Sequence, residues 1–152
     1  MGITLHWSFG NGYSSENYEK YYGSNSRKQL EETIKVAEKV KNHMGDRCDY
    51  VVPNGLAVNY ARRIASLRSI KDKLLKPDGN HLENGIPMYL VSMTYAMTLV
   101  PDINVTTVSW YPTSSDDPDI EVGASEINAM YARQCAARAT GQDPYYDRTT
   151  NW

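Results

Sequence analysis

An aspartate and a histidine three residues apart are the side chains of this chain best placed to do chemistry. Asp78 and His81 lie in the stretch 77–82, and a Gly-Asn dipeptide between them favours a tight turn. Leu82 is expected to anchor the loop in the core while His81 points outward. A carboxylate on such a turn can hold an imidazole in the tautomer that accepts a proton from a hydroxyl. The pair therefore predicts the acid–base half of a serine-hydrolase site, although the same spacing also occurs in plain surface loops.

The segments around this loop predict alternating strands and helices. Two segments rich in β-branched and aromatic residues predict strands, at Ile3–Trp7 and Cys48–Pro53. The second has a Tyr-Val-Val run that suits a strand buried on both faces, as in parallel sheets. Apolar residues at helical spacing predict helices at Ser26–Gly45, from Asn54 towards Leu74, at about Asn84–Leu99 and at Ser125–Ala139. This order is typical of α/β folds, which bind ligands at the carboxyl ends of their strands.

Local signals refine these elements. Ser26 and Gln29 match a capping box at the start of the first long helix. Residues 8–25 predict a long surface loop with one helical turn near Tyr18–Tyr22. The run 105–108 predicts either an edge strand or an extended segment over the surface.

The loop and its surroundings resemble a known family. Asp78-Gly79-Asn80-His81-Leu82, followed by Gly85 and Tyr89-Leu90, resembles the last block of the SGNH (GDSL-type) hydrolases. More closely, most of the chain is similar to the C-terminal half of a bacterial branch of that family. The shared features also include a Pro-containing turn after the second strand, a paired arginine and a Trp-Tyr-Pro segment, which here are residues 52–57, Arg62-Arg63 and Trp110-Tyr111-Pro112.

The resemblance implies a three-layer α/β/α, flavodoxin-like fold and the hydrolysis of an ester, often an acyl group on a carbohydrate. By carry-over, His81 would be the general base and Asp78 its orienting acid. Trp7, His6 and Asn54 would contact the substrate, with no cofactor and no metal. On this basis residues 1–152 form a single partial domain with a helical extension over about 113–152.

The family's serine block is missing from this chain. No Gly-Asp-Ser or Gly-Asn-Ser turn follows the first strand, and the blocks that supply oxyanion donors have no match. Three explanations remain open: a truncated chain, a split protein whose partner carries the serine, or a degenerate relative used for binding. In each, the strand at Ile3–Trp7 has lost a neighbour and is expected to pair with another chain, either a copy of itself or the N-terminal half.

Two functions therefore remain. The first is the Asp-His portion of an SGNH-type ester hydrolase; the second is a non-catalytic binding or assembly module on the same fold.

A net charge of −2 gives no basic field for nucleic acid or anionic lipid. The most apolar run, Ile86–Val100, is too short and too polar to span a membrane. No signal peptide is recognised, which leaves the localisation open, and an extracytoplasmic setting is compatible with the parent protein.

Other candidate residues have simpler interpretations. His43 lies at a helix end, where a cation is favourable. An acidic cluster at Asp116, Asp117 and Asp119 could hold calcium but is more typical of a solvated loop. Cys48 and Cys135 have no metal-ligand spacing and are expected to be free thiols, with a disulfide as the alternative. Residues 104–106 match a glycosylation sequon, a pattern that is common by chance.

Overall fold

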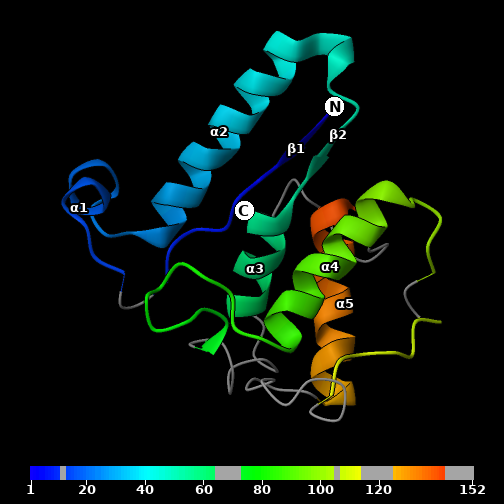
Figure 1. Ribbon diagram of the computed structural model, residues 1–152. Coiled ribbons are helices and arrows are strands. Elements are labelled where there is room, and N and C mark those ends of the chain that lie inside the picture. Colours follow the sequence, from blue (N-terminus) through cyan, green and yellow to red (C-terminus); the bar gives the residue numbers. More distant parts are fainter. Residues whose placement is uncertain (11–12, 64–72, 105–106, 114–124, 143–152) are drawn as a thin grey trace.

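Two short parallel strands organise the fold. β1 (Gly2–Thr4) and β2 (Tyr50–Val52) pair with Ile3 opposite Val51, and helices surround them (Figure 1). This computed structural model describes residues 1–10, 13–63, 73–104, 107–113 and 125–142. Its helices are α1 (Glu16–Tyr22), α2 (Ser26–Met44), the 3₁₀ turn η1 (Gly45–Arg47), α3 (Asn54–Arg63), α4 (Ile86–Leu99) and α5 (Glu126–Thr140). The described structure is mixed α/β, as predicted, but it is mostly helical with a sheet of two described strands, and the three-layer arrangement stays a prediction.

Both strands are shorter than predicted. The ladder continues one residue past β1, because the Leu5 amide donates to the Val52 carbonyl at 2.9 Å. His6 and Trp7 then leave the strand direction, and Pro53 has no amide with which to extend β2. The prediction that β2 is buried on both faces is wrong. Val52 is fully buried, but Tyr50 remains 37% exposed, with its ring lying over Gly2.

Helix α2 makes the crossover between the two parallel strands. The capping prediction for it is wrong by one residue: the Oδ1 atom of Asn25 accepts the amides of Arg27 and Lys28, each at 3.0 Å. Asn25 has extended backbone angles, whereas Ser26 is already helical and cannot serve as the cap. Of the predicted apolar stripe only Leu30 is buried, and Val40 is 41% exposed. The stripe of α2 is therefore only partly covered.

The core lies among α3, α4 and α5. Helix α5 presents small residues that are completely buried, so the neighbouring helices can approach its backbone closely: Ala129, Ala132, Cys135 and Ala136. Leu90 and Met97 of α4 belong to the same cluster, each 1% exposed. The segment that we expected as a C-terminal extension thus contributes a central element of the core.

Helix α4 begins at Ile86, two residues later than predicted. Gly85 precedes it with a φ of 91°, outside the helical region, and the predicted Pro87 lies in the first turn. Beyond the helix, residues 103–104 and 107–113 contain no strand, while 105 and 106 lie outside the described residues. A polar contact holds this segment instead: the Tyr89 hydroxyl donates to the Trp110 carbonyl at 2.9 Å.

Candidate active site

The stretch around Asp78 and His81 forms a closed turn. Leu75 and Leu82 make an antiparallel bridge across its base, and the Lys76 amide donates to the His81 carbonyl at 2.7 Å. Gly79 has a φ of 71°, a left-handed conformation that the absence of a side chain permits. As predicted, a tight turn sets the acid and the histidine at its two corners.

Asp78 holds the turn together through both of its carboxylate oxygens. Oδ1 accepts the backbone amides of Asn80 at 2.8 Å and His81 at 3.0 Å. Oδ2 lies 2.6 Å from Nδ1 of the His81 ring. The His81 side chain, followed by the two amides, lowers the pKa of Asp78 to about 2. An ionised Asp78 accepts a hydrogen bond from the protonated Nδ1, and the lone pair of the neutral imidazole is then on Nε2.

Both side chains of this pair face solvent. His81 is 72% exposed and Asp78 is 49% exposed. The imidazole is therefore accessible to a hydroxyl or a substrate from outside the described chain. Its orientation is fixed from behind by the carboxylate, which is the arrangement that a general base requires.

The loop that follows β1 supports the turn. Nε1 of Trp7 donates to the Asn80 carbonyl at 2.7 Å, and the Gly10 amide donates to the Gly79 carbonyl at 2.8 Å. A Cβ atom on Gly79 would lie 2.6 Å from the backbone nitrogen of Tyr13, so the two loops are in direct contact. The structure thus brings the predicted substrate residue Trp7 to the predicted catalytic pair.

An arginine from α3 fixes this supporting loop. Arg62 donates from Nη1 to the Ser8 hydroxyl and from Nη2 to the Ser8 carbonyl, both at 2.9 Å. Ser8 is 2% exposed, and burial lowers the pKa of the Arg62 guanidinium. The Phe9 amide also donates to Gln29 Oε1 of α2 at 2.8 Å. The sequence marked Arg62 only through the family resemblance and gave no sign of its partner.

The other two predicted substrate residues are placed differently. His6 stacks on Trp7 with ring centroids 4.3 Å apart, and its Nδ1 lies 2.7 Å from the Trp7 carbonyl. His6 is exposed, and it directly precedes Trp7, whose indole nitrogen donates to the turn. Asn54 is 1% exposed at the start of α3, and its Oδ1 has no hydrogen-bond partner. Among the described residues no hydrogen bond joins Asn54 to the turn.

No nucleophile for His81 is found within the described ranges. None of the serine hydroxyls there forms a hydrogen bond with the ring; Ser8 is bound by Arg62, and Ser15 caps α1. Cys48 and Cys135 are free and buried, and burial raises the pKa of Cys135 to about 12, so this thiol is a poor nucleophile.

Neither a cluster of metal ligands nor a membrane-spanning helix is found in the described part of the chain. It contains no group of three or more side chains suited to hold a metal ion. The acidic cluster at 116–119 falls outside the described residues. Nor does any described helix combine the length and apolar character needed to cross a bilayer.

Comparison with known proteins gives a likeness in fold. No protein-family model matches the chain, and no curated protein does. A crystal structure of a DUF4886 family protein from Bacteroides uniformis superposes with a TM-score of 0.68 and 21% sequence identity. The alignment covers 91% of this chain and 48% of that one. The present chain therefore spans about half the length of its structural neighbour and shares the fold of that part.

Proposed function

We propose that this chain carries the acid–base half of an SGNH-type ester hydrolase, and that a hydroxyl nucleophile comes from another polypeptide segment. In this proposal His81 removes the proton of that hydroxyl as it attacks the ester carbonyl, and returns a proton to the leaving alcohol. Asp78 keeps the imidazole in the correct tautomer and stabilises the imidazolium that forms. The substrate class is a small ester, including acyl groups on carbohydrates.

The observation that carries this proposal is the 2.6 Å contact between Asp78 Oδ2 and His81 Nδ1 on an exposed turn. Asp78 also accepts two backbone amides, so its carboxylate is held in place before any substrate arrives. A surface ion pair alone would need neither of these amides nor the docking of the turn on Trp7. The likeness to a chain about twice as long leaves room for a segment that supplies the serine.

The test is the hydrolysis of p-nitrophenyl acetate by this chain alone and by the chain combined with the polypeptide encoded directly before it. We expect background rates for the chain alone and turnover for the combination. His81→Ala should then lower kcat by at least about 10³-fold, because the base is lost. His43→Ala, at the exposed end of α2, is the matched control and should change nothing. Turnover that survives His81→Ala rejects the proposal.

A second candidate function is that of a binding or assembly module, and the open edge of β1 favours it. The Leu5 amide donates to the Val52 carbonyl, and the Asp49 amide donates to the Met1 carbonyl. The backbone groups of the odd-numbered residues at this end of the chain therefore face β2. Gly2 and Thr4 therefore direct their amide and carbonyl groups to the opposite edge, where no described strand pairs with them. An unpaired strand edge is a template for an added strand. In this alternative His81→Ala leaves assembly unchanged.

A further inference from the structure

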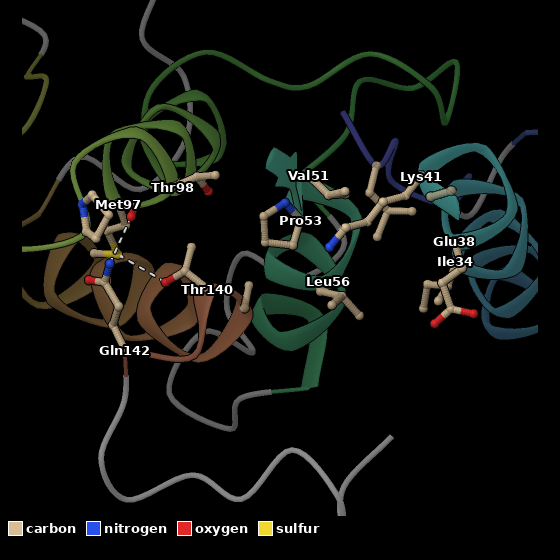
Figure 2. A pocket seen from close by; sticks show the side chains of 14 residues that line it. Ile34, Glu38, Lys41, Val51, Pro53, Leu56, Met97, Thr98, Thr140 and Gln142 are labelled. Carbon is tan, nitrogen blue, oxygen red and sulfur yellow. Dashed lines mark hydrogen bonds between the residues drawn. The ribbon is translucent and has the colours of Figure 1, made fainter. Parts of the chain in front are cut away.

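A cavity away from the Asp78–His81 turn opens between α2 and the C-terminal ends of α4 and α5 (Figure 2). Its volume is about 510 Å³, within the range of sites that enclose small organic ligands. No residue of the turn lines it. The lining comes from five segments of the chain: Leu5, Ile34, Ala37, Glu38, Lys41, Val51, Pro53, Leu56, Met97, Thr98, Pro101, Ala139, Thr140 and Gln142.

Nine of the fourteen residues that line the cavity are apolar. Leu5 and Leu56 are buried in the core, and the half-buried Val51 of β2 also lines the cavity. Met97 and Ala139 close the opposite side, exposed by 1% and 2%. Such a surface favours an apolar body over a strongly hydrated ligand.

One cation reaches into this apolar space. Figure 2 shows the Lys41 side chain extending from α2 towards Pro53 and the middle of the cavity, while the Glu38 carboxylate points away from it. Within the described residues Lys41 forms no ion pair, and it is the single basic side chain of the lining. An ammonium group placed against an apolar wall attracts an anionic group on a ligand.

The wall opposite Lys41 offers hydrogen-bond acceptors. The hydroxyl of Thr98 donates to the Thr94 carbonyl at 2.7 Å, and that of Thr140 donates to the Ala136 carbonyl at 3.0 Å. Nε2 of Gln142 donates to the Met97 carbonyl at 2.8 Å. The two hydroxyl protons and one amide hydrogen of Gln142 are already committed, so the oxygen atoms of the three side chains remain as acceptors beside the second amide hydrogen of Gln142. A ligand that spans the cavity therefore binds more tightly if it carries a hydrogen-bond donor at this end.

We propose that the cavity binds a small carboxylic acid with an apolar body and a hydroxyl or amine at its far end. The carboxylate pairs with Lys41, the apolar body lies against Leu56, Val51 and Met97, and the distal donor meets the oxygens of Thr98, Thr140 or Gln142. This assignment is independent of the hydrolase proposal, since it uses neither Asp78 nor His81.

The test is a titration of the full chain, labelled with ¹⁵N, with 3-(4-hydroxyphenyl)propionate and with the matching carboxamide. We expect the acid to shift the amide signals of cavity residues such as Lys41, Leu56 and Gln142, and to bind about tenfold more tightly than the carboxamide. Lys41→Met should remove this preference, and Lys41→Arg should restore it. Lys39→Met, on the same helix but outside the lining, is the matched control and should behave as the wild type.

Three results overturn the proposal. The first is an absence of shifts at the cavity in the full chain. The second is equal affinity for acid and carboxamide, or an affinity for the acid that Lys41→Met leaves unchanged. The third is binding of the acid by a chain that ends at Gln142 but not by the full chain, because residues beyond Gln142 would then fill the cavity.

Discussion

Asp78 is the residue on which the candidate site depends, because one carboxylate serves three donors. Two of them are backbone amides that close the turn, and the third is the His81 ring. With the histidine three residues after the acid, the same residue supplies both a backbone amide to Oδ1 and its ring to Oδ2. The same contacts make the turn sensitive to the ionisation of one group.

The ionisation of Asp78 gives a prediction about acid pH. Its pKa falls from an ordinary value of 3.8 to about 2 in the folded chain. A lowered pKa means that the carboxylate stabilises the turn above about pH 4, and that this contribution is lost as the pH falls towards 2. A ¹³C titration of the Asp78 carboxyl carbon should show a midpoint near 2. In His81→Ala the midpoint should rise, since the largest cause of the shift is removed; an unchanged midpoint would contradict this assignment.

Gly79 tests the docking of the turn on the loop after β1. Gly79→Ala adds a Cβ atom at a φ of 71° and 2.6 Å from the backbone nitrogen of Tyr13. Gly23→Ala is a matched control, because Gly23 has a φ of 60° but no atom within 4 Å of its added Cβ. We expect about 1 kcal/mol of destabilisation for Gly23→Ala in urea unfolding and a larger loss for Gly79→Ala. Equal losses would mean that the contact with Tyr13 is unimportant.

Among the elements, α5 determines how closely the core helices approach. Its buried face consists of alanines and Cys135, which leave no space for larger side chains. Ala136→Leu should therefore cost about 1–3 kcal/mol in urea unfolding through overpacking. Gln134→Leu, exposed on the same helix, should stay within about 0.5 kcal/mol of the wild type. An Ala136→Leu chain as stable as the wild type would show that this face is loosely packed.

The elements also show what the sequence could predict. Helices α2, α4 and α5 were predicted within two residues at most ends, because their apolar spacing and glycine or proline boundaries are local signals. The predicted ends of the strands were wrong, because the strand that pairs with each one decides where it stops. The turn around Asp78 was predicted from its own residues. Its anchors, the Trp7 and Arg62 contacts, were not, because they join residues more than 50 positions apart.

At the scale of the whole molecule, the sheet of only two described strands leaves one edge of β1 open to pairing with a further strand. β1 lies between β2 and an open edge, and Tyr95 of α4 reaches that side through a 2.7 Å contact with the Thr4 hydroxyl. Tyr95 is one of three exposed apolar residues at helical spacing on α4, together with Met88 and Leu99. We expect another strand, from a second copy or from a separate N-terminal segment, to add to β1.

Proline substitutions in β1 separate the two edges of this strand. The Thr4 amide faces the open edge, so Thr4→Pro should block an added strand and leave the β1–β2 pairing intact. Ile3→Pro should instead disrupt the pairing with β2, and Thr4→Val controls for the lost hydroxyl. Sedimentation over a range of concentrations should show association in the wild type and in Thr4→Val but not in Thr4→Pro. A wild-type chain that remains monomeric, alone and with the preceding polypeptide, would contradict the role of this edge.

The tautomer of the His81 ring tests the central claim most directly, because the proposed chemistry needs Asp78 to hold the proton on Nδ1. Long-range ¹H–¹⁵N spectra of the ring, recorded where the imidazole is neutral, distinguish the two nitrogens. We predict a protonated Nδ1 and an unprotonated Nε2 in the wild type, with the preference lost in Asp78→Asn. A proton on Nε2, or the same tautomer mixture in both proteins, would contradict the account.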